Sequence, residues 1–293
     1  ERDNTREKET YTHTYRHTDR LTETSCGARN IFIYTSSVAI VARDMRPSGV
    51  ELVDAFSQGL MEQGVDVIDI GLASTDLVYF AAGRLDAPGA MFTASHNPAQ
   101  YNGVKLCLAG ARPVGVDTGL DLVKETARRV LNGDGPKPSD RSGRRTERDL
   151  LASFVDHVLS FVDVDELRPM KVVADTANGM GGLVVPAVFE RLPRIELEVM
   201  YPELDGTFPN HPADPLQPAN QRDLQARVVA GGFDLGLAFD GDADRVFVVD
   251  EQGLGLSGST TTALLAASIL RKHPGATVLP NLICSRAVPE VVR

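Results

Sequence analysis

The sequence predicts an α/β fold whose sheet is largely parallel and carries helices on both faces. Short apolar, β-branched runs alternate with segments of helical periodicity between residues 37 and 93, and a second series of this kind begins at residue 147. Such alternation is typical of doubly wound α/β domains, which place their ligands at the carboxyl ends of the strands. A chain of 293 residues is long enough for two such domains or more.

In the first series, residues 37–41, 65–70 and 89–93 are predicted strands because they are short, apolar runs. Two helices are expected between them. One follows Ser48, a suitable N-cap, and ends at Gly64, and the other covers residues 75–85. A strand at 104–108 and a helix at 118–131 come next. Residues 133–145 are rich in Gly, Pro, Ser and charge, which indicates a domain linker.

The second series begins with an expected helix at 147–162 and a strand at 171–175. The glycine-rich turn at 178–182 matches neither the GxGxxG nor the P-loop spacing, so we expect it to serve close strand–helix packing. A long proline-rich loop covers residues 202–218, and strands at 234–239 and 246–249 follow. A helix capped by Ser257 or Ser259 is predicted to run to residue 272, before another strand at 276–279.

The composition argues against several classes of protein. The formal net charge of -10 argues against a nucleic-acid partner, because phosphate backbones demand basic surfaces. No apolar stretch reaches the length of a membrane span and the first residues contain no apolar signal region, so we expect no membrane association. Cys26, Cys107 and Cys284 are widely scattered and show no metal-ligand spacing, which favours a reducing cytoplasm.

One polar segment directly follows the strand at 89–93. It reads Thr-Ala-Ser-His-Asn-Pro over residues 93–98, with Tyr-Asn-Gly-Val-Lys at 101–105. Pro98 fixes its own φ and drives Asn97 toward extended geometry, so Ser95 and His96 lie on a stiffened loop. A stiff loop at a strand end can hold a nucleophile. An ordinary polar turn between two strands is the alternative.

A second polar segment, Asp-Gly-Asp-Ala-Asp-Arg at 240–245, sets carboxylates at Asp240, Asp242 and Asp244. Three neighbouring carboxylates repel one another, so the segment predicts a bound cation, and Mg2+ beside a phosphate is the favoured one. An EF-hand is disfavoured because Arg245 occupies the position that needs glycine and because a strand, not a helix, follows. A metal loop with a purely structural role stays open.

Four motifs in the same order resemble the alpha-D-phosphohexomutase superfamily, and within it the bacterial phosphomannomutase/phosphoglucomutase group. They are TASHNP with YNGVK, FDGDADR, Val-Ala-Arg-Asp-Met-Arg-Pro-Ser at 41–48 and Phe-Pro-Asn-His-Pro at 208–212, and the likeness runs from about Val38 to the last residue. The resemblance implies domain I at residues 31–146, domain II at 147–253 and an incomplete start of domain III at 254–293. Residues 1–30 are polar, unlike the family and expected to be disordered.

The resemblance also implies a reaction and its residues. Ser95, as phosphoserine, would exchange its phosphoryl group with a hexose 1- or 6-phosphate of mannose or glucose through a hexose 1,6-bisphosphate. Mg2+ would be held by Asp240, Asp242, Asp244 and the phosphate on Ser95. The other implied catalytic residues are His96, Lys105 (acid/base) and Arg245, and the implied substrate- and phosphate-binding residues are Arg43, Arg46, Asn97 and Asn102. For each of the two arginines Arg43 and Arg46, a surface or interdomain salt bridge is the alternative.

The sequence also allows three alternatives to a phosphohexomutase. A serine hydrolase lacks its G-x-S-x-G elbow here, and adjacent Ser95 and His96 are poorly placed for a nucleophile–base pair. An aspartyl-phosphate phosphatase would use Asp240 as nucleophile and Asp242 as acid/base. The family's later sugar-recognition and phosphate-binding loops are not found, so the chain looks truncated, and a metal-binding remnant without turnover is the third alternative.

Overall fold

The fold is described from a computed structural model, which places residues 36–292 and a short strand, β1 (Tyr15–Arg16). β1 pairs antiparallel with β5 (Tyr101–Asn102). The rest of the tail 1–30, predicted to be disordered, lies outside the described residues. No helix within the described part of the chain is both long and apolar enough to cross a membrane.

The first sheet is mixed and has the strand order β7-β6-β4-β2-β3-β8. Its four parallel strands are β2 (Val38–Arg43), β3 (Asp66–Leu72), β4 (Gly89–Phe92) and β8 (Arg145–Glu147). The antiparallel strands β6 (Val104–Leu108) and β7 (Arg112–Pro113) complete one edge. The prediction of a largely parallel sheet is therefore confirmed for this domain.

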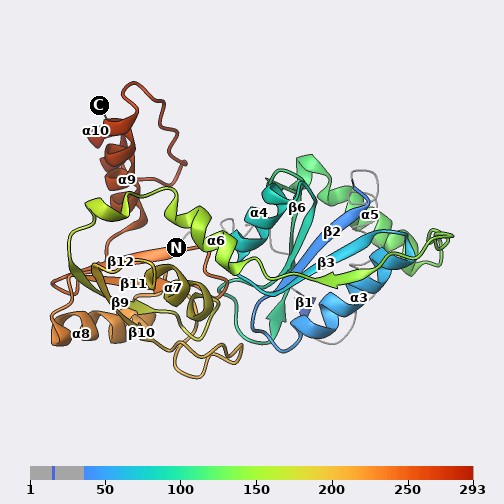
Figure 1. Cartoon of the computed structure of the whole chain (residues 1–293), viewed down its shortest axis with the longest axis horizontal. Helices are drawn as coiled ribbons and strands as arrows, with labels where there is room; N and C mark the ends of the chain where they lie inside the picture. Colours follow the sequence, from blue (N-terminus) through green and yellow to red (C-terminus); the bar gives the residue numbers. More distant parts are fainter. Residues whose placement is uncertain (1–14, 17–35, 293) are drawn as a thin grey trace, which may run out of the picture.

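Helices cover both faces of this sheet, as the alternation of its strands requires (Figure 1). Ala39 and Val41 of β2 face α3 (Gly49–Glu62) and α5 (Leu120–Leu131), whereas Ile40 and Ala42 face α4 (Thr75–Arg84). A short 3-10 helix, η1 (Val116–Thr118), precedes α5. The side chain of Ser74 caps α4 by accepting a hydrogen bond from the backbone N–H of Leu77.

The second sheet has the order β10-β9-β11-β12. β9 (Met170–Asp175), β10 (Ile195–Met200) and β11 (Leu235–Phe239) are parallel, and β12 (Val246–Asp250) is antiparallel to β11. Its helices are α6 (Leu151–Leu159), α7 (Gly181–Phe189) and α8 (Arg222–Gly231), with 3-10 turns η2 (Val164–Glu166) and η3 (Pro218–Gln221). Two α/β/α lobes result, which lie side by side in Figure 1.

A continuous apolar core joins the two lobes. It combines side chains of α4 in the first lobe with side chains of α6 and its N-cap, α7 and β9 in the second, namely Leu77, Val78, Leu150, Phe154, Ala174, Val184 and Val185. Burial of apolar surface at this junction opposes separation of the lobes, at roughly 25 cal/mol per Å2. The strand ends that carry the two polar segments are therefore held against each other.

The structure differs from the predicted elements at residues 145–150 and 276–279. Residues 145–147, predicted to end a linker and begin a helix, instead form β8 along β3, so α6 starts at Leu151. The expected strand at 276–279 is absent from the described residues, because this proline-flanked stretch finds no partner strand and leaves Leu279 88% exposed. α9 (Gly258–Lys272) is capped by Ser257 and is followed by α10 (Ala287–Val291).

Candidate functional site

Ser95 lies just beyond the carboxyl end of β4, where parallel sheets place their ligands. Its backbone has a φ of 51°, the left-handed region that non-glycine residues seldom adopt, and its side chain is buried. The hydroxyl of Thr93 accepts a hydrogen bond of 2.8 Å from the Ser95 N–H and supports this conformation. Strain of this kind, held by surrounding contacts, is typical of functional residues.

The acidic segment forms a tight loop between β11 and β12. Ala243 adopts a φ of 56°, and its N–H donates to the Asp240 carbonyl over 3.1 Å. This turn brings one oxygen each of Asp240, Asp242 and Asp244 to within 4.8 Å of one another. The three carboxylates that are predicted to share a cation therefore lie together.

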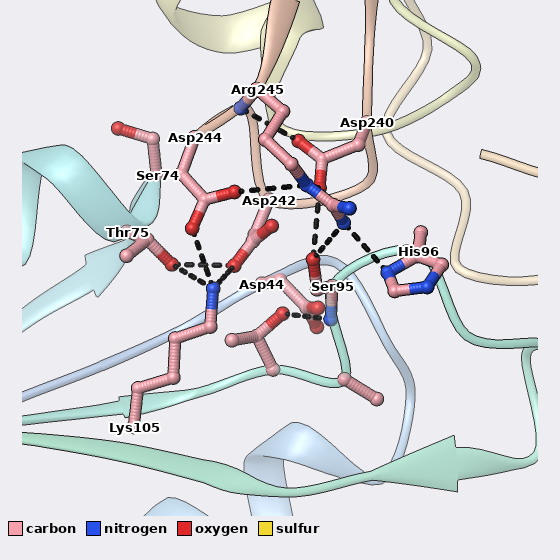
Figure 2. A network of polar contacts seen from close by, with 12 residues as sticks. Asp44, Ser74, Thr75, Ser95, His96, Lys105, Asp240, Asp242, Asp244 and Arg245 are labelled. Atoms are coloured by element: carbon pink, nitrogen blue, oxygen red, sulfur yellow. Dashed lines mark hydrogen bonds and ion pairs between the residues drawn. The ribbon is translucent and has the colours of Figure 1, made fainter. Parts of the chain in front are cut away.

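The serine and the acidic loop, about 145 residues apart in sequence, meet at the lobe junction (Figure 2). The Ser95 hydroxyl donates to Asp240 Oδ2 over 2.8 Å. Arg245 Nη2 donates to Ser95 Oγ over 2.7 Å and to Asp240 Oδ2 over 2.6 Å. The same Nη2 lies 2.6 Å from His96 Nδ1. The four side chains therefore form one hydrogen-bonded cluster.

Lys105, on β6, reaches the acidic loop from the other side. Its Nζ lies 2.6 Å from Asp242 Oδ2 and 2.7 Å from Asp244 Oδ2. Burial opposes the charged ammonium, but the carboxylates of Asp242 and Asp244 outweigh it and raise the pKa of Lys105. Lys105 is therefore firmly protonated in this arrangement.

Thr75, the first residue of α4, fixes Asp242 through two contacts. Its hydroxyl donates to Asp242 Oδ2 over 2.5 Å, and its backbone N–H donates to the Asp242 carbonyl over 3.1 Å. The N-terminus of α4 thus approaches the acidic loop, and its dipole favours negative charge there. Sequence reasoning missed this residue, although its place at a strand-to-helix junction was visible.

The carboxylates fit a divalent cation. Asp242 Oδ1 is buried and has no hydrogen-bond partner among the described residues, an arrangement that costs free energy unless a further ligand satisfies it. Burial and the neighbouring Asp242 carboxylate raise the pKa of Asp240, although Arg245 opposes this. A hard cation with oxygen ligands, such as Mg2+, would relieve both the unpaired oxygen and the repulsion.

Arg46 is completely buried beneath the Ser95 loop. Its Nε pairs with Asp44 Oδ2 at 3.1 Å. The remaining four donors reach backbone carbonyls of the loop, those of Ser95 (2.9 Å), Asn97 (2.7 Å), Pro98 (2.9 Å) and Tyr101 (3.1 Å). All five N–H donors of the guanidinium are thus engaged within the protein. This geometry supports a role in shaping the loop, in place of the predicted phosphate binding.

The other predicted binding residues also make contacts within the protein. Asn97 Nδ2 donates to the Ala94 carbonyl over 2.9 Å, and Asn102 Nδ2 donates to Ser48 Oγ over 2.9 Å. Arg43 lies apart from the cluster, where it lines a pocket of about 600 Å3 together with the carboxyl ends of β3 and β8. Its Nη1 donates to the carbonyl of Asp44.

Replacing Arg46 by alanine is expected to lower the free energy of unfolding by about 3–5 kcal/mol, because the change leaves the buried Asp44 carboxylate without its cation. Urea denaturation measures this loss. Arg128→Ala is the matched control, since Arg128 is exposed and 3.8 Å from Glu125, and we expect it to change stability by at most about 0.5 kcal/mol. Equal losses in the two variants would refute a buried, fully paired Arg46.

The glycine-rich turn packs closely, as predicted, and it also touches the acidic loop. An added Cβ on Gly179 would lie 2.7 Å from the Gly241 carbonyl oxygen, and the Met180 N–H donates to that oxygen over 2.9 Å. Gly181 packs against Thr176. The turn therefore supports the acidic loop from beneath.

His211, in the proline-rich loop, makes a pH-sensitive contact with the end of β9. Its Nε2 lies 3.0 Å from Asp175 Oδ2. Burial disfavours the imidazolium, but the hydrogen bond and charge of Asp175 outweigh it and raise the pKa of His211 above 6.5.

The stabilising effect of this pair should therefore be complete below about pH 6.5 and should decline as the pH rises through the folded-state pKa. Urea titrations of the wild type and His211→Gln at pH 5.5 and 8.5 measure it. We expect the variant to lose more stability at pH 5.5. A loss that is larger at pH 8.5 would show that the imidazolium is not stabilised.

Fold and site together define a class, a two-lobed α/β protein with a serine–carboxylate centre at its lobe junction. The sequence matches two models of the phosphoglucomutase/phosphomannomutase family. The model of alpha/beta/alpha domain I matches residues 24–130, and the model of alpha/beta/alpha domain II matches residues 152–253. The chain belongs to the alpha-D-phosphohexomutase superfamily.

Individual relatives agree with this membership. A phosphomannomutase of Salmonella montevideo is 39% identical over 246 residues, which cover 82% of this chain and 53% of that protein. A phosphoglucomutase of Neisseria gonorrhoeae is 36% identical over 254 residues, 86% of this chain and 53% of that protein. A phosphoglucomutase/phosphomannomutase family structure from Burkholderia thailandensis matches with a TM-score of 0.82 and 30% identity, over 96% of this chain and 62% of that one. The chain spans about half the length of the curated relatives it matches.

Proposed function

We propose that this chain carries the phosphoserine centre of a phosphohexomutase, which interconverts hexose 1-phosphate and hexose 6-phosphate of mannose, glucose or both. The observation that carries the proposal is the 2.8 Å contact between Ser95 Oγ and Asp240 Oδ2 within a cluster of three carboxylates and two cations. Relatives named phosphomannomutase and phosphoglucomutase support the same function.

In the proposed reaction, Ser95 is carried as phosphoserine. The bond between phosphorus and Ser95 Oγ breaks while a sugar hydroxyl oxygen bonds to phosphorus, which gives hexose 1,6-bisphosphate; in net terms the proton of that hydroxyl ends on Ser95 Oγ. After the bisphosphate turns around, its other phosphoryl group returns to Ser95. Catalysis of this kind rests on positioning and charge neutralisation. Arg245, within 2.7 Å of Ser95 Oγ, is placed to stabilise negative charge on the transferring phosphoryl oxygens.

Asp240, Asp242 and Asp244 would hold Mg2+, together with a phosphate oxygen on Ser95. When bound, this ion would neutralise negative charge on the phosphate. Lys105 supplies a protonated ammonium beside the same carboxylates, which suits the proton-donor half of an acid/base role. It can accept a proton only after leaving these ion pairs, because they stabilise its charged form.

His96 has a defined proton arrangement in this site. Burial and the Arg245 charge lower the pKa of His96, which favours the neutral imidazole. Since a guanidinium nitrogen only donates, Nδ1 accepts from Arg245 and Nε2 carries the proton. The Nε2–H is thus a donor for a phosphate or sugar oxygen.

The contacts of the cluster weigh against the two hydrolase alternatives. Asp240 is fully buried, and its Oδ2 already accepts hydrogen bonds from Ser95 and Arg245, which disfavours attack on an incoming phosphate. Ser95 Oγ donates to Asp240, and His96 Nδ1 is taken by Arg245, so no serine–histidine pair forms.

We propose sugar phosphates as the ligands, without nucleic acid or membrane, in the cytoplasm. The free thiols of Cys107 and Cys284 suit a reducing compartment. The domain boundaries after residues 146 and 253 stay a prediction; the chain forms two separate sheets, and the first boundary falls within β8 of the first sheet.

A metal-binding remnant without turnover is the second candidate, and exposed apolar side chains favour it. On α9 and the segment after it these are Leu264 (60% exposed), Leu265 (59%), Ile269 (55%), Leu279 (88%), Leu282 (102%) and Ile283 (76%). A mutase assay of the 293-residue chain distinguishes the candidates, with mannose 1-phosphate or glucose 1-phosphate, Mg2+ and a glucose 1,6-bisphosphate primer. Turnover supports the mutase, and a folded chain that binds Mg2+ without turnover supports the remnant.

A further inference from the structure

The proline-rich segment after β10 is a sequence motif that the proposed function leaves without a role. Two of its residues contact Arg46 in the other lobe. The Phe208 ring centroid lies 5.0 Å from the Arg46 guanidinium, a cation–π distance. An added Cβ on Gly206 would lie only 2.6 Å from Arg46 Cα, so this backbone rests directly on the backbone of Arg46.

Arg46 transmits this contact to the nucleophile. Its Nη2 donates to the carbonyl of Ser95, whose backbone has the strained positive φ, and to the carbonyl of Asn97 two residues later. Phe208 packs on the guanidinium and thereby limits its movement. The orientation of Ser95 thus depends on a ring supplied by the second lobe.

The segment is anchored to the same turn that supports the acidic loop. We call residues 203–211 the 203–211 loop. The Asp205 N–H donates to the Asn178 carbonyl over 3.0 Å, and Asn178 Nδ2 donates to the Glu203 carbonyl over 3.0 Å. Two residues after Asn178, the Met180 N–H holds the Gly241 carbonyl. One turn therefore sets the positions of the 203–211 loop and of the acidic loop relative to each other.

We propose that the 203–211 loop is a positioning element, which sets Ser95 in register with Asp240 through Phe208 and Arg46. The proposal rests on the proposed role of Ser95 as phosphate acceptor. Ser95 is held at two points, at its hydroxyl by the acidic loop and at its carbonyl by Arg46, and both supports trace back to the 178–180 turn. Phe208 is a positioning residue, because it acts through Arg46.

We expect the fold to tolerate removal of the Phe208 ring. It is only half-buried and lies outside the apolar core clusters of the described residues, unlike Arg46, which is fully buried. Phe208→Ala removes the ring, and Phe208→Tyr keeps it. Phe161→Ala is the matched control, because Phe161 lies just beyond α6 and is 70% exposed.

The first readout is the rate at which the 293-residue chain takes phosphate on Ser95 from glucose 1,6-bisphosphate with Mg2+, followed by quenching and mass spectrometry. We expect Phe208→Ala to slow this rate about tenfold at saturating bisphosphate, since small misplacements of reacting groups are costly, with the half-saturating concentration unchanged. Phe208→Tyr and Phe161→Ala should react at the wild-type rate.

The second readout needs no phosphate transfer. Hydrogen exchange at the amides of Asn97 and Tyr101, which donate to Ala94 and Pro98 carbonyls, should be faster in Phe208→Ala than in the wild type and both other variants. Faster exchange with no phosphate uptake by the wild type would leave the positioning role standing and overturn the phosphoserine proposal. Wild-type exchange in Phe208→Ala, or faster exchange with an unaltered rate of phosphate uptake, would overturn the inference.

Discussion

Ser95→Ala is expected to take up no phosphate from glucose 1,6-bisphosphate and to lose mutase turnover by at least about 10⁴-fold, the scale of removing a nucleophile. The reason is geometric. Ser95 Oγ is the hydroxyl that contacts both Asp240 and Arg245, where the carboxylates and cations converge. Intact-protein mass spectrometry and a coupled assay of glucose 6-phosphate formation measure the two effects.

This variant should keep its fold, because Asp240 and Arg245 stay paired with each other at 2.6 Å. Its thermal unfolding and its Mg2+ affinity therefore check that the loss is chemical. Ser153→Ala, at an exposed position on α6, is the matched control and should behave as the wild type. Phosphate uptake by Ser95→Ala at the wild-type rate would rule out Ser95 as the acceptor.

Asp242→Asn is expected to weaken Mg2+ binding by at least about a hundredfold. Loss of a residue that only supports a metal ligand costs up to about a hundredfold in affinity, and Asp242 is itself a proposed ligand. Asp242 is buried, and its Oδ1 has no partner among the residues that the structure describes, so the change removes charge where a cation would bind. Isothermal titration calorimetry of the chain with Mg2+ measures the affinity. Asp140→Asn, at an exposed position in the 133–145 segment, serves as control.

Lys105→Met should change the Mg2+ affinity in the opposite direction. The Lys105 ammonium pairs with Asp242 Oδ2 and Asp244 Oδ2, and its positive charge repels a cation that enters beside these carboxylates. Weaker binding in Asp242→Asn with tighter binding in Lys105→Met would locate the site at these carboxylates. Unaltered affinity in both variants would place the cation elsewhere.

Most of the fold was predictable because its strands are short apolar runs between strong turn signals. Gly64 ends α3 with a φ of 83°, and Ser257 caps α9, as their residue types indicate. The predictions were wrong where pairing with a distant strand decides the secondary structure. Residues 145–147 are polar and exposed, yet they form β8 because β3 offers an unpaired edge, and no local pattern reveals that edge.

Some residues of the candidate site were predictable from the sequence, and others were not. Ser95 and the three aspartates were predictable because their motifs follow strands, and strand ends gather at one edge of a sheet. The roles of Arg46 and Thr75 were not. Both depend on contacts across long sequence separations, such as Arg46 with the Tyr101 carbonyl and Thr75 with Asp242. A sequence shows which groups are present, but only the folded chain shows which of their donors are already occupied.

Locating the phosphate tests most directly whether Ser95 is the phosphoryl acceptor. The chain is incubated with glucose 1,6-bisphosphate and Mg2+, digested, and mapped by mass spectrometry before and after hydroxylamine, which cleaves an acyl phosphate but not a phosphoserine. We expect a hydroxylamine-resistant phosphate on the peptide that contains Ser95. A hydroxylamine-labile phosphate on the peptide that contains Asp240, or no phosphate on a folded chain that binds Mg2+, would contradict this expectation.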